Sequence, residues 1–267
     1  MSVRRRAPSR PGDSHVRTNR RFWEAGSDEY DRRHRKALEK GLAPTWGLWR
    51  VPEASLQLLG PIRGKDVLEF GCGAARWSIS LARLGARPVG LDATRSQLQK
   101  AAKLIASARV TLPVVQANAE RVPFGDARFD VVFCDWGAMT FCDPQRTVPE
   151  CARVLRRGGL LVFSTASPLR YIAFDAKKDR QDRRLHKSYF DLRQVTLGDT
   201  VEFQLPYGEW IALFARNGLT VEQLVETRPA PGARSSYLDR HDARWAQKWP
   251  MEAIWRVRKT GMPTRRA

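Results

Sequence analysis

The chain has 267 residues, enough for one α/β domain with a sizeable hydrophobic core and additions at its ends. No apolar stretch approaches the roughly 18 residues of a membrane-spanning helix, and no apolar run follows the basic N-terminus as in a secretory signal. The sequence therefore predicts a soluble, cytoplasmic protein without a membrane partner. Its four cysteines form no C-x-x-C pair, so neither a metal site nor a disulfide framework is expected.

The net charge of +19 raises the question of a nucleic-acid partner. Seven arginines fall within the first 21 residues, and the other basic residues are scattered along the chain. This scatter disfavours nucleic acid. The expected partner is a small molecule, either anionic or aromatic.

Residues 1–18 are rich in Arg, Pro and Ser without apolar periodicity, which predicts a disordered basic tail. Residues 19–60 follow as a helical segment, and residues 61–267 as the main domain. Trp23, Tyr30 and His34 are spaced by seven and four residues, so they share one face of a helix. That helix either covers a ligand site or packs against the edge of a sheet, and the pattern does not decide between the two.

The main domain alternates apolar runs with amphipathic segments. Strands are predicted near residues 65–70, 88–92, 112–116, 129–134, 160–165, 219–226 and 253–259. Helices are predicted near 53–59, 75–84, 95–108, 145–155 and 208–217. Such alternation implies right-handed crossovers and a mostly parallel sheet, with ligands at the carboxyl ends of its strands. Two insertions, 168–206 and 228–250, are expected on the substrate side.

A glycine turn, Gly71-Cys72-Gly73, joins the first strand of this domain to its helix. It is not a dinucleotide fingerprint, because Arg76 stands where the third glycine of G-x-G-x-x-G belongs. Glu69 would repel a pyrophosphate but suits a cationic ligand, and Asp92 ends the next strand, where an acid can accept ribose hydroxyls. The sequence thus favours a cationic nucleoside without phosphates, and S-adenosylmethionine fits that description.

Four segments resemble, in order, the motifs of class I S-adenosylmethionine-dependent methyltransferases, most closely the type 11 small-molecule branch. They are residues 67–73 with 90–92, residues 116–124, residues 129–133 and residues 154–162. The resemblance covers residues 64–166. It implies a Rossmann-like α/β fold with a mostly parallel seven-stranded sheet, helices on both faces, and S-adenosylmethionine as cofactor.

The resemblance and the pattern together give three sets of candidate residues, with no metal ligand among them. The cofactor set is Trp23, Glu69, Phe70, Gly71, Gly73, Asp92, Ala93, Gln97, Asn118, Ala119, Glu120 and Cys134. The candidate catalytic residues are His34, Tyr30 and Asp135. The candidate acceptor residues are Trp136, Tyr171, Gln204 and Tyr207.

The expected activity is transfer of a methyl group to an oxygen, nitrogen or carbon of a small molecule. Positioning and desolvation suffice for such an in-line displacement, with optional help from a base. One alternative is an RNA or DNA methyltransferase, which is disfavoured because residues 134–137 lack an Asn/Asp-Pro-Pro-aromatic run. The other is a non-catalytic cofactor-binding module, disfavoured because Glu69, Gly71, Gly73 and Asp92 are all present.

Overall fold

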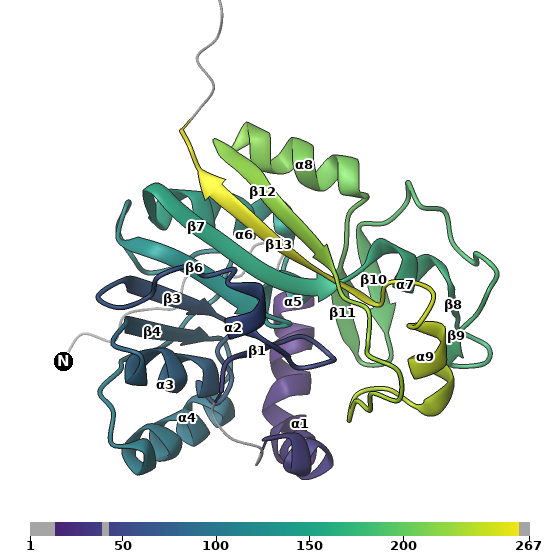
Figure 1. Ribbon diagram of the computed structural model, residues 1–267, viewed down its shortest axis with the longest axis horizontal. Coiled ribbons are helices and arrows are strands. Elements are labelled where there is room, and N and C mark those ends of the chain that lie inside the picture. Colours follow the sequence, from purple (N-terminus) through teal and green to yellow (C-terminus); the bar gives the residue numbers. More distant parts are fainter. Residues whose placement is uncertain (1–13, 39–42, 262–267) are drawn as a thin grey trace, which may run out of the picture.

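The computed structural model describes residues 14–38 and 43–261. Its centre is a seven-stranded sheet in the order β12-β13-β7-β6-β3-β4-β5 (Figure 1). The strands are β3 (Asp66–Phe70), β4 (Arg87–Asp92), β5 (Val114–Gln116), β6 (Phe129–Asp135), β7 (Leu155–Ala166), β12 (Leu219–Glu226) and β13 (Glu252–Lys259). Strand β13 alone reverses, pairing antiparallel with both β7 and β12. The predicted Rossmann-like α/β fold is confirmed.

Helices cover both faces of this sheet (Figure 1). On one face, α6 (Pro144–Val154) and α8 (Tyr207–Arg216) pack over Leu68, Val132 and Leu161. The other face carries α3 (Arg76–Arg83) and the segment after the short α2 (Glu53–Leu56). Helix α4 (Arg95–Ala108) lies beside α3. Every residue of β3 is buried, as expected of a parallel strand covered on both sides.

The elements of the two predicted insertions gather beyond the carboxyl ends of the parallel strands, on the right of Figure 1. Helix α5 (Ala138–Phe141) follows β6, and α7 (Pro168–Ile172) and α9 (Arg240–Trp245) lie in the two predicted insertions. The antiparallel pairs are β1 (Thr45–Trp46) with β2 (Val51–Pro52), β8 (Phe174–Asp175) with β9 (Arg180–Gln181), and β10 (Gln194–Leu197) with β11 (Thr200–Phe203). Within residues 14–38 and 43–261, no helix is long and apolar enough to cross a bilayer.

Helix α1 (Ser14–Leu38) is longer than predicted. The prediction that the tail extends to residue 18 is wrong for Ser14 to Thr18, which are helical. The reason is a tertiary contact that no local pattern shows: the buried His15 ring places Nε2 2.5 Å from Glu120 Oε1. Residues 1–13, the rest of the predicted tail, and residues 39–42 lie outside the described part of the chain.

Strand β7 also begins earlier than predicted. Its first residue is Leu155, and the strand runs through the glycines that were expected to separate α6 from it. Leu155 pairs with Phe129 of β6, and Arg156 binds Asp66 at 2.8 Å and Asp130 at 2.9 Å. These contacts align residues 155–159 with the sheet, so tertiary pairing overrides the local turn signal.

Candidate active site

One cavity of about 460 Å³ lies at the carboxyl ends of the parallel strands. Its floor comes from the β3–α3 turn and from the ends of β4 and β6, which supply Gly71, Asp92 and Asp135. Helix α1 and residues 43–50 line it as well, and so do Arg170 and Tyr237 from the two insertions. The cavity therefore joins the methyltransferase-like core to segments far from it in the sequence.

The glycine turn is held by backbone contacts. The amides of Gly71 and Cys72 both donate to the carbonyl of Leu91, at 2.8 and 2.9 Å, which ties the turn to β4. Gly71 has φ of +79°, and a Cβ there would lie 2.4 Å from the amide nitrogen of Ala138. At this position, close approach of the α5 backbone already requires glycine. Gly73, with φ of +50°, has Gln97 Oε1 as its nearest neighbour at 3.6 Å.

Asp92 at the end of β4 organises the loops around it. Its Oδ2 accepts from the Gly73 amide at 2.8 Å, and its Oδ1 accepts from the Thr94 amide at 2.9 Å and the Thr94 hydroxyl at 2.5 Å. Burial raises the pKa of this carboxyl. A carboxylate has about four acceptor positions, so Oδ2 keeps capacity for a ligand hydroxyl.

Two further buried carboxyl groups line the cavity. Glu69 accepts from the amide and hydroxyl of Ser78, at 3.0 and 2.5 Å, and burial raises its pKa to about 8. Asp135 accepts from the Ser164 hydroxyl at 2.5 Å and the Gly47 amide at 2.9 Å, and burial raises its pKa as well. In the described chain, neither forms an ion pair with a basic residue. A cationic ligand would supply the missing positive charge.

Helix α1 is fastened across the cavity at several points. The Asn19 side chain pairs with the Val201 backbone of β11 in both directions, at 2.7 and 2.8 Å, as a neighbouring strand would. Glu24 caps α4 by accepting from the amides of Arg95 and Ser96, both at 2.8 Å. Together with the His15–Glu120 pair, these contacts hold α1 beside the cofactor-binding loops.

The aromatic face of α1 turns toward the cavity. Trp23 and Tyr30 line it, and the Trp23 ring makes edge contacts with Tyr30 and Phe141 at centroid distances of 5.5 and 5.3 Å. His34 does not line it. Its Nδ1 lies 2.9 Å from Ser236 Oγ, and its ring stacks on Tyr237 at 4.2 Å. His34 therefore contacts Tyr237 and not the cavity itself.

Nine of the twelve expected cofactor residues line the cavity: Trp23, Glu69, Gly71, Gly73, Asp92, Ala93, Gln97, Asn118 and Ala119. The other three are placed behind it. Phe70 is fully buried in the core. Glu120 joins His15 to Arg146 and the Asp143 amide. Cys134 Sγ accepts from the amides of Gly137 and Met139, at 3.2 and 3.4 Å.

Of the expected acceptor residues, the structure brings only Trp136 to the cavity. The Tyr171 hydroxyl donates to Glu202 at 2.5 Å, inside a separate apolar cluster. The Gln204 side chain is buried between the Ala166 carbonyl and the Trp210 indole. The Tyr207 hydroxyl donates to Glu226 at 2.9 Å, beside β12. Gln204 thus fastens the first insertion to β7, Tyr171 links two parts of that insertion, and Tyr207 links α8 to β12.

Glu252, which the sequence did not single out, supports the wall of the cavity. It is fully buried and accepts from the Leu48 amide at 2.7 Å, the Thr227 hydroxyl at 2.7 Å and the Trp136 indole at 2.8 Å. Burial raises its pKa to about 7. Glu252 begins an antiparallel strand, so it lies at the same edge as the carboxyl ends of the parallel strands. This position could have identified it as a site residue from the sequence.

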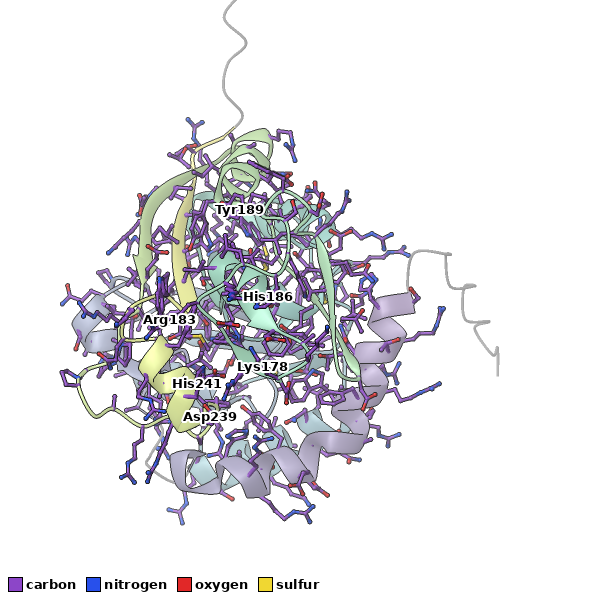
Figure 2. All side chains as sticks on the ribbon, turned by 90° about the vertical axis from the view of Figure 1, so that its right-hand side faces the viewer. Lys178, Arg183, His186, Tyr189, Asp239 and His241 are labelled. Carbon is purple, nitrogen blue, oxygen red and sulfur yellow. The ribbon has the colours of Figure 1, made fainter. Side chains whose placement is uncertain are left out.

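Two other histidines, His186 and His241, lie away from the cavity. His186 is on the face turned to the viewer in Figure 2, with Nε2 3.3 Å from Asp182. The Lys178 ammonium lies 3.0 Å from Asp175 and 3.4 Å from Asp182, so a cation already occupies this acidic group. His241 of α9 places Nε2 2.7 Å from the Gln181 carbonyl.

The sheet order and the glycine turn above a strand-terminal acid define a Rossmann-like methyltransferase fold. A family model described as a methyltransferase domain matches residues 68–163. An uncharacterized protein of Mycobacterium tuberculosis is 38% identical over 117 residues, 41% of this chain and 43% of that protein. A ubiquinone biosynthesis O-methyltransferase of Alkalilimnicola ehrlichii is 34% identical over 110 residues, 41% of this chain and 44% of that enzyme. This chain thus matches less than half the length of either relative.

Among solved structures, an S-adenosylmethionine-dependent methyltransferase from Mesorhizobium loti superposes with a TM-score of 0.64. The superposition covers 77% of this chain and 95% of that one at 20% identity. The family match over residues 68–163 and the shared fold together confirm the resemblance of the motifs to class I S-adenosylmethionine-dependent methyltransferases. The family match and the structural neighbours imply S-adenosylmethionine as the cofactor.

The residues present fit that cofactor. Buried carboxyl groups without ion-pair partners, Glu69 among them, suit its sulfonium and ammonium charges, and Asp92 suits its ribose. Asn118 Oδ1 accepts from the Glu120 amide at 2.9 Å and has a second lone pair for the adenine amino group. The faces of Trp23 and Tyr30 can stabilise a sulfonium.

Proposed function

We propose that the protein transfers a methyl group from S-adenosylmethionine to an oxygen, nitrogen or carbon atom of a small-molecule acceptor. The bound cofactor supplies the activated methyl group, and the chain supplies position, shielding from water and charge. The observation that carries this proposal is one cavity that is lined both by the cofactor residues and by Trp136, Arg170 and Tyr237.

The size and closure of this cavity support a small acceptor over a nucleic acid. Its volume of about 460 Å³ must hold both cofactor and acceptor. Helix α1 and the 228–250 insertion meet above it, with the hydroxyls of Tyr30 and Tyr237 2.9 Å apart. A polymeric acceptor would need the Tyr30–Tyr237 contact to stay open throughout methyl transfer, whereas a small molecule can enter during a transient opening. The ubiquinone-pathway relative, by its name an O-methyltransferase, agrees with a small acceptor.

Among the candidate bases, the geometry favours Asp135. It lines the cavity, and burial keeps its pKa above the ordinary value, as proton transfer near neutral pH requires. Tyr30 also lines the cavity, but burial raises its pKa, so its hydroxyl serves as a hydrogen-bond donor. We assign His34 the role of positioning Tyr237 through the stacked rings.

The test combines cofactor binding with turnover. Purified protein should bind S-adenosylmethionine in calorimetry and release S-adenosylhomocysteine when given fractionated small-molecule extracts. Asp92→Ala should weaken cofactor binding at least tenfold, because charge-assisted hydrogen bonds to ribose contribute about 1.5 to 3 kcal/mol each. Asp199→Ala, at an exposed aspartate outside the cavity, is the matched control. Cofactor binding without product from any extract would favour the non-catalytic alternative.

A further inference from the structure

Arg170 has a buried guanidinium nitrogen without an acceptor. It belongs to α7 and lines the cavity. Its Nη1 is shielded from solvent, and no atom in the described chain accepts a hydrogen bond from it. Buried polar groups are nearly always paired, and a cationic donor left unpaired is costly. Arg170 is only half-buried at the cavity wall and forms no ion pair within the described protein, so its charge is available to a ligand in the cavity.

The position of this guanidinium is set by an aromatic ring. Arg170 Cζ lies 5.0 Å from the centroid of the Trp136 ring, in cation–π geometry. The Trp136 indole is itself fixed by its hydrogen bond to the buried Glu252. The N–H groups of a guanidinium lie in its plane, where a pair of them matches the two oxygens of a carboxylate.

The nearby acidic groups have other partners. Asp242 Oδ1 accepts from the Gln181 amide at 3.0 Å, and Glu202 accepts from the Tyr171 hydroxyl at 2.5 Å. Asp135 is held by the Ser164 hydroxyl and the Gly47 amide. None of the three lies within ion-pair distance of Arg170. Within residues 14–38 and 43–261, no carboxylate pairs with Arg170, which leaves its charge for a bound anion.

The cofactor itself contains a carboxylate, so the two ends of the cavity must be distinguished. Arg50 belongs to the β1–β2 segment and acts on Asp135, where its charge opposes the rise of the carboxyl pKa. Arg170 instead acts on Tyr171 and Asp242, both in or beside the insertions. Arg50 also acts on Tyr237, whereas Arg170 contacts the ring of Trp136, the one expected acceptor residue that lines the cavity. Arg170 is therefore the arginine that lies beside an acceptor residue.

We propose that the methyl acceptor carries a carboxylate, and that Arg170 binds it while the apolar body of the acceptor packs on Trp136. This inference rests on the proposed function, because it names the acceptor class of the same site. It also accounts for a cation placed beside apolar lining residues, because Leu48, Trp136 and Tyr237 belong to one apolar cluster. Arg170 is a specificity-determining residue in this assignment.

The experiment measures binding to protein saturated with S-adenosylhomocysteine, so that the cofactor carboxylate is already in place. The probes are matched carboxylate and primary-amide pairs: benzoate with benzamide, phenylacetate with phenylacetamide, and octanoate with octanamide. Ligand-observed NMR titrations give each dissociation constant. In at least one pair the carboxylate should bind tenfold tighter than the amide, which corresponds to about 1.4 kcal/mol.

Variants assign that preference to Arg170. Arg170→Met should reduce carboxylate binding to the amide level, Arg170→Lys should restore part of the preference, and Arg180→Met, at an exposed arginine outside the cavity, should change nothing. Thermal unfolding of each variant checks that the fold is kept. The dissociation constant for S-adenosylmethionine should stay within twofold in Arg170→Met.

Several results would overturn the inference. They are amides that bind as well as carboxylates in every pair, no carboxylate binding at millimolar concentration, or a preference that survives in Arg170→Met. A tenfold loss of S-adenosylmethionine affinity in Arg170→Met would move Arg170 to the cofactor carboxylate and also contradict it. If the wild-type protein binds S-adenosylmethionine but shows no anion preference, this inference fails and the proposed function stands. If it does not bind S-adenosylmethionine, the proposed function fails.

Discussion

The hydroxyl groups of Tyr30 and Tyr237 lie 2.9 Å apart, although 207 residues separate them in the chain. The His34 ring stacks on Tyr237 with an interplanar angle of 23°, which adds a second contact between α1 and the insertion. Helix α1 and the 228–250 insertion therefore meet over the cavity. The stability of this contact determines how readily the cavity opens.

A double-mutant cycle should detect this coupling. Tyr30→Phe and Tyr237→Phe remove the same hydrogen bond, so each should lower the free energy of unfolding by about 1 kcal/mol, and the double variant by little more than either. Denaturant titrations measure all three values. Tyr207→Phe is the control, because its hydroxyl binds Glu226 elsewhere, and its effect should add to that of Tyr30→Phe. Strict additivity of Tyr30→Phe and Tyr237→Phe would show that the two hydroxyls are not coupled.

Two N-terminal deletions should behave differently. Removing residues 1–13 breaks none of the described contacts and should leave S-adenosylmethionine affinity within about twofold. Removing residues 1–18 also removes the contact of His15 with Glu120, so α1 should loosen. We expect weaker cofactor binding and faster amide exchange over residues 19–38 in the longer deletion.

The same exchange measurement tests whether α1 closes the site. In the intact protein, S-adenosylmethionine should slow exchange over residues 19–38, because Trp23 and Tyr30 line the cavity. If the cofactor leaves that exchange unchanged, α1 only packs on the domain. Equal cofactor affinity and equal amide exchange in the two deletions would show that His15 does not stabilise α1.

An added side chain should destabilise the protein more at Gly71 than at Gly73. A Cβ at Gly71 would lie 2.4 Å from the Ala138 amide nitrogen, and φ is +79°, so Gly71→Ala should destabilise the fold as well as weaken cofactor binding. Gly73→Ala should cost about 1 to 2 kcal/mol from its φ of +50° alone, because its nearest neighbour is 3.6 Å away. Thermal unfolding of both variants without cofactor measures the contrast. A Gly71 variant as stable as the wild-type protein would contradict the Ala138 contact.

Most of the fold could be predicted from the sequence alone, because the strand and helix patterns of the core are local. The last two strands, near residues 219–226 and 253–259, were predicted, and the structure pairs them antiparallel, with Leu224 opposite Trp255. The start of α1 was missed because His15 is ordered by Glu120, a contact across 105 residues. Only the tertiary structure reveals such a pair.

The candidate site was less predictable where it lies outside the core motifs. Asp92 and Glu69 follow from their places at strand ends, so the spacing of motifs is enough to find them. Tyr171 looked like a pocket residue because it is aromatic and lies in an insertion, but its hydroxyl is bound to Glu202. Arg170, next to it, faces the cavity. Which of two neighbours in a short helix points inward depends on packing that has no periodic signal over five residues.

The pKa of Glu69 leads to a prediction about pH. Burial raises this pKa to about 8 in the protein without ligand, against an unfolded value near 4.5. The native state then holds a proton that the unfolded state has lost between pH 4.5 and 8, so the contribution of Glu69 to stability is present below pH 4.5 and lost as the pH rises to 8. A cation bound near Glu69 reverses the preference of the native state for the protonated side chain, because it stabilises the charged carboxylate.

Binding of S-adenosylmethionine at pH 7 should therefore release a proton from Glu69, and affinity should rise as the pH approaches 8. Calorimetry in two buffers with different ionisation enthalpies measures the number of protons released. Because the amino group of the cofactor titrates in the same range, Glu69→Gln is the reference. This variant keeps an acceptor for Ser78 but cannot ionise. On binding the cofactor, it should therefore release almost one proton fewer than the wild-type protein. Equal proton release by the two proteins would show that Glu69 is already ionised before the cofactor binds.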